Sequence, residues 1–431
     1  MHPARGALTW MGSMTAPELL GLISAALLLQ LVAGVGWTLW RRLTVPQEAT
    51  AQPAVSPTGA ARELPAWSGW RAFRVLRREY EDAARSQCSF YLQPVDGAAL
   101  PAFKPGQFLT FSLDVAGTPA GPGQAVAART VTRCYSLSDR PDPAQYRVTI
   151  KRVPAPAEHP EFEPGLSSNH FHDRVQVDDV LRVKAPSGHF FIDADPGVPA
   201  VLIGGGIGIT PMMSMLGWCI ATQPQRRLYL YYGLRNGQEH AFKAQLEALA
   251  ASHPALHLHI VYSRPGAADQ AGRDYQHQGH VDVELLRRTL PHGRHQFYVC
   301  GPPALMQTLV PALAQWGVPL GDLHYEAFGP ASVKLQGAAV PEPAAAGAVE
   351  VKFQRSGRTL SWDGRDASLL DFAERHGIEV DSGCRSGGCG SCETRLLSGQ
   401  VGYEHRPDHD VAAGHCLLCV GRPASPIALE A

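Results

Sequence analysis

Short apolar runs separated by Gly, Pro and Asp make up the first half of the chain. The runs at 73–76, 89–92, 108–113 and 146–153 mix aromatic and β-branched residues, which is typical of strands. No long helical pattern separates them, so they predict an antiparallel β-barrel of about 100 to 125 residues. From residue 200 the pattern changes. Apolar strands at 200–203, 228–232 and 256–261 alternate with a helix-like stretch at 242–251, which indicates βαβ units and a parallel sheet.

Two further stretches have a different character. Residues 19–40 carry no charge and are rich in Leu, Ala, Val and Ile. The stretch is long enough to cross a bilayer core as one helix. Linkers poor in large apolar residues are expected at 41–66 and 335–347. The predicted fold is therefore a multidomain α+β and α/β chain. Its expected parts are a transmembrane helix at 19–40, a barrel at 67–195, a parallel-sheet nucleotide-binding domain at 196–334 and a C-terminal domain at 348–431.

The apolar stretch at 19–40 is expected to anchor the chain in a membrane. Trp37 and Trp40 suit the lipid–water interface, and Arg41 and Arg42 after them favour the cytoplasmic side for the domains that follow. A cleaved signal peptide is the alternative, which the length of the stretch and the lack of a small-residue cleavage site before Arg41 disfavour. We expect a single-pass protein of the inner, cytoplasmic membrane with its soluble domains facing the cytoplasm.

Composition narrows the possible partners. The chain has 431 residues, 45% of them hydrophobic, and a formal net charge of −1. This length leaves room for about three domains with separate cores. Because there is no basic excess to neutralise phosphates, we expect no nucleic-acid partner.

The cysteines carry the most specific chemistry. Cys384, Cys389 and Cys392 have the spacing C-x₄-C-x₂-C, and Cys419 follows at a distance, which is the plant-type ferredoxin pattern for a [2Fe-2S] cluster. A Cys₄ zinc site would repeat a close pair, and nine cysteines are too few, and odd in number, for a disulfide framework. Cys416 is the rival fourth ligand, with Cys419 favoured. We therefore predict a β-grasp ferredoxin domain at 348–431 that carries electrons.

A glycine turn follows the strand at 200–203. A strand, a glycine turn and a helix in this order suit a nucleotide pyrophosphate, since glycines let the phosphate approach the backbone closely. Pro211 stands where the standard dinucleotide fingerprint has its third glycine. We expect Gly205, Gly206, Gly208 and Pro211 to contact the nucleotide.

The sequences RCYSL at 133–137 and GLSSN at 165–169 resemble the flavin site of the ferredoxin–NADP reductase superfamily, and the wording is most similar to the reductase module of flavohaemoglobins. The resemblance implies that Arg133 neutralises the flavin phosphate, Tyr135 packs on the isoalloxazine ring and Ser136 hydrogen-bonds near its N5 atom. It places Ser168 and Asn169 at the pyrophosphate, where a helix N-terminus would favour an anion. Lys151 and Gly165 are further cofactor-binding candidates.

The sequence CGPP at 300–303 resembles another signature of this superfamily, in which the cysteine lies beside the nicotinamide carbon that gives up hydride. By this resemblance Cys300, Gly301 and Pro302 contact the nucleotide and Thr210 lies near the nicotinamide. Glu326 corresponds to a Glu-x-Phe element that caps the flavin region. The catalytic candidates are Tyr135, Ser136, Cys300 and Glu326.

The choice of cofactors is partly open. Arg264 follows the third strand of the parallel sheet, where related enzymes hold the 2′-phosphate of NADPH, but a single arginine leaves NADH and NADPH equally open. The similarity of the motif sequences to flavohaemoglobins favours FAD. The domain order is similar to phthalate dioxygenase reductase and to the reductase of the hybrid-cluster protein, and the first of these makes FMN the alternative.

The expected function is a membrane-anchored NAD(P)H-dependent iron–sulfur flavoprotein reductase. Flavin joins the hydride chemistry of NAD(P)H to the one-electron chemistry of the cluster. The expected acceptor is a separate redox protein such as an oxygenase, a desaturase or a cytochrome. A dehydrogenase that reduces quinone and a non-catalytic redox sensor are the alternatives.

Overall fold

The computed structural model describes residues 30, 66–67, 69–116, 128–155, 164–192, 195–328, 349–383, 385, 387, 389–404, 407, 409 and 411–431. Contacts divide the chain into two units, Met1–Glu63 and Leu64–Ala431, and every described residue except residue 30 belongs to the second. Among the described residues, no helix combines the length and apolarity needed to cross a membrane. The predicted span at 19–40 and the predicted linkers at 41–66 and 335–347 lie outside these residues, apart from residues 30 and 66.

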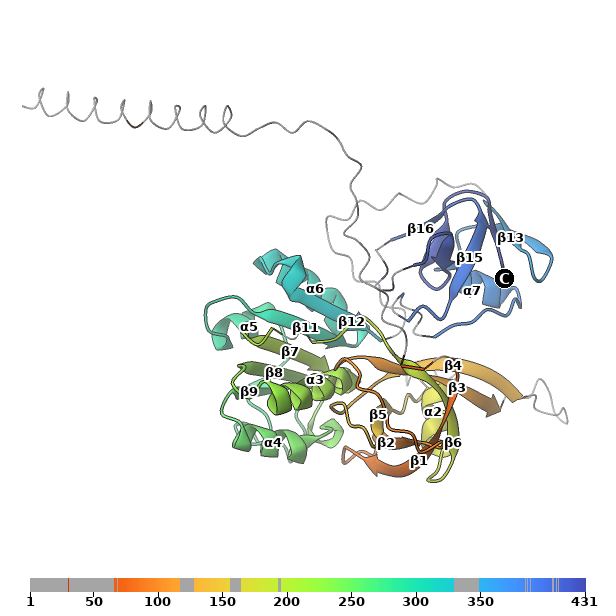
Figure 1. Cartoon of the computed structure of the whole chain (residues 1–431). Helices are drawn as coiled ribbons and strands as arrows, with labels where there is room; N and C mark the ends of the chain where they lie inside the picture. The colour runs from red at the N-terminus through yellow and green to blue at the C-terminus, as the bar shows by residue number, and fades with distance from the viewer. Residues whose placement is uncertain are drawn as a thin grey trace, which may run out of the picture. The chain divides into compact units, whose positions relative to one another are not determined.

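The first sheet is an antiparallel barrel (Figure 1). Its strands are β1 (Arg71–Tyr80), β2 (Gln87–Pro94), β3 (Phe108–Ala116), β4 (Ala128–Ser136), β5 (Tyr146–Lys151) and β6 (Val180–Ser187). They pair in the order β4-β3-β6-β1-β2-β5, and a bridge between Leu137 and Val148 joins the two edges. The antiparallel barrel that the short apolar runs predicted is therefore confirmed.

One helix, α2 (Leu166–Asp173), follows β5 in the chain and contributes Phe171 to the barrel core. Phe171 is fully buried, and its ring packs edge-on against Phe90, Phe111 and Tyr135 at centroid distances of 5.1, 5.3 and 5.2 Å. Edge-to-face pairs at these distances add to the free energy gained from burial alone. Helix α2 is thereby packed against β2, β3 and β4.

The second sheet is wholly parallel and has helices on both faces. Its strands are β7 (Ala200–Gly205), β8 (Leu228–Leu234), β9 (Leu256–Tyr262), β10 (His277–Gln278), β11 (Gln296–Gly301) and β12 (Leu323–Ala327), in the order β10-β9-β8-β7-β11-β12. The helices are α3 (Ile209–Thr222), α4 (Lys243–Ser252), α5 (Val283–Thr289) and α6 (Pro303–Trp316), with short 3₁₀ turns η1 (Gly206–Gly208), η2 (Gly237–Glu239) and η3 (Leu320–Asp322).

This sheet has a separate core on each face. Met212 and Leu246 on α3 and α4 pack on one side, and Leu286 and Met306 on α5 and α6 pack on the other. Strands buried on both faces read as continuous apolar runs, which is why 200–203 and 228–232 were recognisable in the sequence. The predicted parallel sheet is confirmed.

The C-terminal domain holds a mixed five-stranded sheet and one helix. The sheet has the order β14-β13-β19-β15-β17, and a separate pair joins β16 to β18. The strands are β13 (Val349–Phe353), β14 (Arg358–Trp362), β15 (Glu393–Ser398), β16 (Val401–Tyr403), β17 (His415–Leu417), β18 (Gly421–Pro423) and β19 (Ile427–Leu429). Helix α7 (Leu369–Arg375) packs Leu369 and Phe372 into the core of this domain. A helix on a mixed sheet agrees with the ferredoxin-like fold predicted for this segment.

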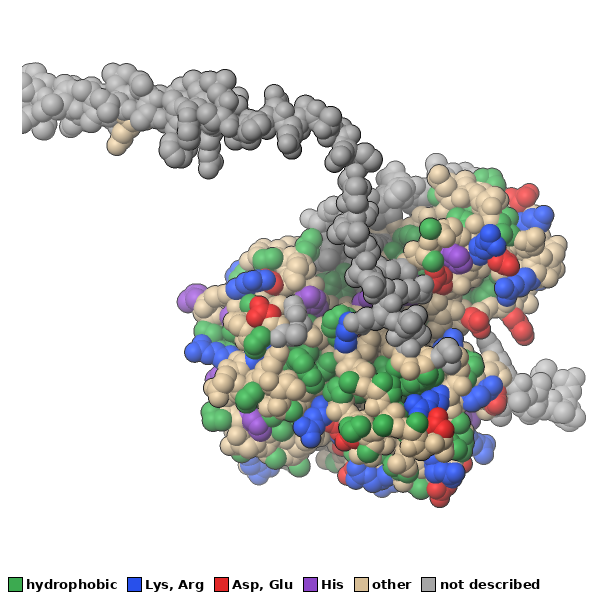
Figure 2. Space-filling model, in the orientation of Figure 1, with side chains coloured by type: hydrophobic (Ala, Val, Ile, Leu, Met, Phe, Trp, Pro, Cys, Tyr) green, Lys and Arg blue, Asp and Glu red, His purple; other side chains and the backbone are tan. Residues whose placement is uncertain are grey.

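The surface of the described residues mixes both signs of charge. On the face shown in Figure 2, Lys and Arg side chains are interspersed with Asp and Glu. Such mixing produces no strong field of a single sign on that face.

Acid is expected to weaken the fold through His240, which lies between η2 and α4. The side chain is buried, and its Nδ1 lies 2.8 Å from the Tyr262 hydroxyl. Burial, with a smaller effect of Lys243, lowers the pKa of His240 to about 4. Since an unfolded histidine takes up a proton near pH 6.5, the unfolded state binds more protons between these values, and stability falls as the pH drops through this window.

At pH 5 the difference between the folded and unfolded pKa of His240 lowers the free energy of unfolding by about 2 kcal/mol. His240→Gln, whose amide oxygen can still accept from Tyr262, is expected to remove that share when urea unfolding is compared at pH 7 and pH 5. The share of His259, whose pKa burial also lowers to about 4, would remain. An acid dependence as steep in the variant as in the wild type would contradict this explanation.

Candidate functional site

A cavity of about 450 Å³ opens beside β4, β5, the start of α2 and the end of β12. Eight of the predicted site residues line it: Arg133, Tyr135, Ser136, Lys151, Gly165, Ser168, Thr210 and Glu326. Phe108, Cys134, Thr149, Ile150, Val153, Leu166, Ser167, Ile207, Ala327, Phe328, Gly383 and Arg385 complete the lining. Residues of the barrel, the parallel sheet and the C-terminal domain therefore share one cavity, whose volume suits a bound cofactor.

The flavin motif supplies one wall of this cavity. Tyr135 and Ser136 lie at the end of β4, and Ser136 is buried. The ring of Tyr135 is held edge-on by Phe111 and Phe171 at 5.8 and 5.2 Å. Burial raises the pKa of Tyr135, so its hydroxyl is neutral at physiological pH. A rigid, uncharged aromatic ring at a cavity wall is suited to stack on a planar cofactor.

The start of α2 supplies a second wall. The helix N-cap is Gly165, no side chain caps the helix, and the first turn holds no acidic residue. The N–H groups of this first turn therefore favour an anion. A Cβ at Gly165 would lie 2.6 Å from Ser168 Oγ and 2.8 Å from Val153 Cβ, so glycine keeps this approach open. Ser167 Oγ is buried and has no hydrogen-bond partner among the residues that the structure describes, which leaves it available to a ligand.

These features fit FAD. The cavity offers an aromatic wall, hydroxyl groups and a helix N-terminus, and the cations Arg133 and Lys151 line it as well. A planar ring system joined to a pyrophosphate needs this combination of surfaces.

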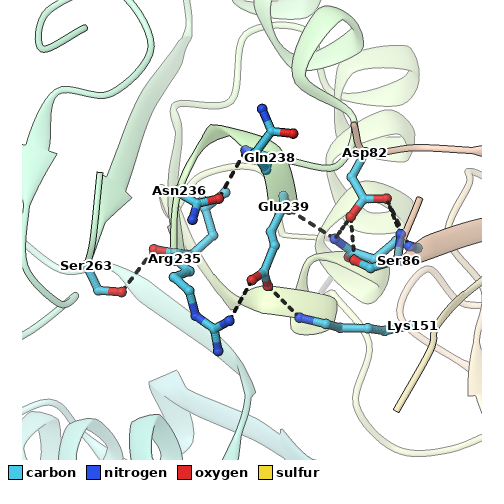
Figure 3. A network of polar contacts seen from close by, with 10 residues as sticks. Asp82, Ser86, Lys151, Arg235, Asn236, Gln238, Glu239 and Ser263 are labelled. Atoms are coloured by element: carbon cyan, nitrogen blue, oxygen red, sulfur yellow. Dashed lines mark hydrogen bonds and ion pairs between the residues drawn. The ribbon is translucent and has the colours of Figure 1, made fainter. Parts of the chain in front are cut away.

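Lys151 also has a partner from the nucleotide-binding domain (Figure 3). Its Nζ lies 2.8 Å from Glu239 Oε2, and Glu239 Oε1 lies 3.0 Å from Arg235 Nη1. The predicted cofactor ligand is therefore one of two cations that share a single carboxylate. No sequence motif pointed to Glu239, because it is 88 residues away from Lys151.

The glycine turn packs directly on the end of β11. Gly206 has φ of +52°, a left-handed value that favours glycine. A Cβ on Gly208 would lie 2.5 Å from the carbonyl carbon of Cys300 and 2.7 Å from the nitrogen of Gly301. The GIG segment and the Cys-Gly-Pro-Pro segment are thus brought together at the carboxyl ends of adjacent parallel strands, where open α/β sheets bind ligands.

Cys300 and Glu326 are neighbours across β11 and β12. They are register partners in the parallel pairing. Cys300 is fully buried, and burial, with a smaller effect of Glu326, raises the pKa of its thiol well above the ordinary value. The thiol is therefore neutral, which suits contact with an uncharged nicotinamide ring better than a thiolate would.

Some predicted residues lie outside the cavity lining. The Asn169 amide donates to the Val153 carbonyl at 3.0 Å, a contact that holds α2 to the end of β5. Gly205, Gly206, Gly208, Pro211, Cys300, Gly301 and Pro302 form the adjoining glycine and CGPP turns. Arg264 follows β9 on the exposed surface. Their roles as cofactor ligands stay predictions.

Two described cysteines of the C-terminal domain, Cys389 and Cys392, have sulfurs that accept backbone amides. Cys392 is buried, and the Cys419 amide donates to its Sγ at 3.4 Å. The Ser391 amide donates to Cys389 Sγ at 3.5 Å. Amide donors aimed at sulfur are the interactions that stabilise cluster thiolates and tune their potential. Cys384 lies outside the described residues, and among the described ones no three ligand-type side chains are grouped closely enough to hold a metal ion.

The loop that carries these cysteines fits a [2Fe-2S] cluster because backbone amides donate to its cysteine sulfurs and because its glycines leave room close to these groups. A Cβ on Gly383 would lie 2.7 Å from Cys389 Sγ, and one on Gly390, at φ +68°, would lie 2.6 Å from His409 Nε2. Cys416 sits inside β17, and burial raises the pKa of its thiol to about 12. Cys419 follows the strand, and its amide meets Cys392, which favours Cys419 as the fourth ligand.

Comparison with known proteins agrees with this geometry. The family described as oxidoreductase NAD-binding domain matches residues 202–310, and the family described as 2Fe-2S iron-sulfur cluster binding domain matches residues 351–424. A flavohemoprotein of Chromobacterium violaceum is 40% identical over 263 residues, which are 61% of this chain and 61% of that protein. The chain thus spans about three fifths of the length of this curated relative.

Two solved structures are similar over longer shares of their own length. The flavohem-like FAD/NAD-binding domain of nitric oxide dioxygenase from Vibrio cholerae is 31% identical, with a TM-score of 0.51, over 61% of this chain and all of that one. Phthalate dioxygenase reductase is 26% identical, with a TM-score of 0.51, over 84% of this chain and 98% of that one.

The fold and the site define an oxidoreductase that combines flavin, nicotinamide and iron–sulfur domains. The chain belongs to the ferredoxin–NADP reductase superfamily, in the group with a C-terminal [2Fe-2S] ferredoxin domain. Its cofactors are FAD, a [2Fe-2S] cluster and NAD(P)H.

Proposed function

We propose that this chain is an NAD(P)H-dependent reductase that supplies electrons to a separate redox protein, such as an oxygenase, a desaturase or a cytochrome. One observation carries the proposal: a single cavity is lined by Tyr135 of the barrel, Thr210 of the nucleotide-binding domain and Gly383 of the cluster loop. When bound, FAD supplies the conversion of hydride into single electrons, and the cluster carries them singly.

The residues around the cavity have distinct tasks. Arg133 and Lys151 provide positive charge for the flavin phosphates, and Tyr135 provides a rigid stacking surface. The neutral thiol of Cys300 and the glycine turn define where the nicotinamide enters. Exclusion of water from this region would protect the reduced cofactor from side reactions.

Similarity to phthalate dioxygenase reductase supports the direction of electron flow. The structure of that protein is described as modular, for electron transfer from pyridine nucleotides to [2Fe-2S]. The similarity to that protein extends over 84% of this chain and 98% of that one. The terminal acceptor of this chain stays a proposal at the level of a redox protein.

Turnover assays test the proposal against its alternatives. A reductase should oxidise NADH or NADPH rapidly with ferricyanide and with cytochrome c as acceptors. Turnover with a short-chain quinone but not with cytochrome c would favour the quinone-linked dehydrogenase. Slow turnover with every acceptor would favour a redox sensor and would contradict the reductase assignment.

We further propose that residues 19–40 anchor the chain in a membrane. The support is the uncharged stretch followed by Arg41 and Arg42. The full chain is expected to stay with the membrane pellet after an alkaline carbonate wash, and a chain that starts at Leu64, where the second unit begins, is expected to be released. Release of the full chain by the same wash would contradict the anchor.

A further inference from the structure

Two arginines lie side by side at the carboxyl ends of β8 and β9. Arg235 follows β8 and Arg264 follows β9, and the Arg264 amide donates to the Arg235 carbonyl at 2.8 Å. The backbone amide of Ser263, the residue before Arg264, donates to the Leu234 carbonyl at 2.9 Å. Because ligands of parallel sheets bind beyond the carboxyl ends of the strands, both arginines lie at the ligand-binding edge of this sheet.

The Glu239 carboxylate forms an ion pair with one of these arginines, Arg235. Glu239 Oε1 lies 3.0 Å from Arg235 Nη1 and its Oε2 lies 2.8 Å from Lys151 Nζ. The Glu239 side chain is 19% exposed, whereas that of Arg235 is 60% exposed. The carboxylate is therefore the fixed member of the pair, and Arg235 is the member that a ligand can approach.

The backbone around Glu239 is also held in place. The side-chain amide of Gln87 in the barrel donates to the Glu239 carbonyl at 3.0 Å. The backbone amide of Ala84 donates to the Gln238 carbonyl at 2.9 Å. Asn236 Oδ1 accepts from the Gln238 amide at 3.1 Å and so caps η2. With its backbone fixed from two domains, Glu239 cannot follow Arg235 away from this position.

The charges have a consequence for the choice of nucleotide. NADPH differs from NADH by a phosphate on the adenosine ribose, which carries close to two negative charges at neutral pH. Arg235 and Arg264 would attract this phosphate, but Glu239 neutralises Arg235 and itself repels the phosphate. We propose that Glu239 is a specificity residue that disfavours nucleotides with a 2′-phosphate, so that the protein prefers NADH. This inference rests on the proposed use of NAD(P)H.

Binding of nucleotide fragments tests the proposal without any turnover. The FAD-saturated protein is titrated by calorimetry with 5′-AMP, the adenosine end of NADH, and with 2′,5′-ADP, the adenosine end of NADPH. Glu239→Gln is expected to raise the preference for 2′,5′-ADP over 5′-AMP about tenfold, because one repulsive charge is removed and one attractive charge is released. An unchanged preference would overturn the proposal.

Two further variants separate this effect from general electrostatics. Glu247→Gln removes the same charge from α4, where Glu247 is exposed and lies 4.0 Å from Lys243, and it should change the preference less than twofold. In the double variant Glu239→Gln, Arg235→Gln the gain should disappear. A gain as large in Glu247→Gln, or one that persists without Arg235, would also overturn the proposal.

Oxidation of NADH and NADPH by the same proteins distinguishes two kinds of failure. If the wild type oxidises neither nucleotide, the proposed function fails, and the fragment titrations still decide the role of Glu239. If the wild type oxidises a nucleotide but Glu239→Gln leaves the fragment preference unchanged, the specificity proposal alone fails.

Discussion

Replacing Cys392 by serine is expected to abolish the visible absorbance of the cluster and to reduce cytochrome c reduction by more than about tenfold. Cys392 is buried, and its Sγ accepts from the Cys419 amide, while its carbonyl accepts from the Leu418 amide, so an oxygen ligand would sit in a pocket shaped for sulfur. Ferricyanide reduction, which the flavin domains can support alone, should change less than twofold. Absorbance spectra and the two assays measure these effects.

Cys416 provides the matched control. It lies inside β17, three residues before Cys419, and contributes to the core of the domain. Cys416→Ala is expected to keep the cluster spectrum and cytochrome c reduction, with a modest loss of stability. Loss of the cluster in Cys416→Ala but not in Cys419→Ala would show that the fourth ligand has been assigned to the wrong cysteine.

Replacing Gly208 by alanine is expected to weaken NAD(P)H binding at least tenfold. Gly208 has ordinary helical dihedral angles, so the backbone conformation itself tolerates alanine. The new Cβ would nevertheless press on the backbone of Cys300 and Gly301, which cannot rotate away as a side chain could. The turn and β11 would have to separate, at a cost of about 1–3 kcal/mol, and the nucleotide site would widen.

Gly217→Ala, in the middle of α3, is the control for this substitution. The nearest atom to its Cβ would be Arg140 Cβ at 3.5 Å, an ordinary contact. Alanine there should stabilise the helix by about 1 kcal/mol and leave nucleotide binding unchanged. Fluorescence titration with NADH and urea unfolding separate the two effects, and equal NADH affinity in the Gly208→Ala variant and the wild type would refute the predicted contact.

Much of the fold could be predicted from local patterns. The run at 228–232 falls inside β8 (Leu228–Leu234), and the helix expected at 242–251 is α4 (Lys243–Ser252). Strands such as β6 and β12 were not predicted, because neither holds a continuous apolar run: three of the eight residues of β6 and one of the five residues of β12 are buried. Helix α2 was expected only as a site for an anion, since its residues LSSNHFHD have a weak apolar face. It is held to the barrel by the ring of Phe171 and by hydrogen bonds of the Asn169 and His172 side chains.

The candidate site was predicted where residues adjacent in the sequence share a surface. Arg133, Tyr135 and Ser136 do line one cavity, together with Thr210 and Glu326. Glu239 and Ser167 could not be predicted, because their importance depends on contacts across domains and on burial, neither of which a motif records. Asn169 was placed at the pyrophosphate by resemblance, and this role stays a prediction; in the structure its side-chain amide donates to the Val153 carbonyl.

An anaerobic titration of the full chain with NADH, and separately with NADPH, tests the central claim most directly. Flavin and cluster absorbance are followed together as reductant is added. A donor–flavin–cluster relay predicts that one nucleotide bleaches both chromophores. Bleaching of the flavin with an unchanged cluster, or purification of the chain without flavin, would contradict the account.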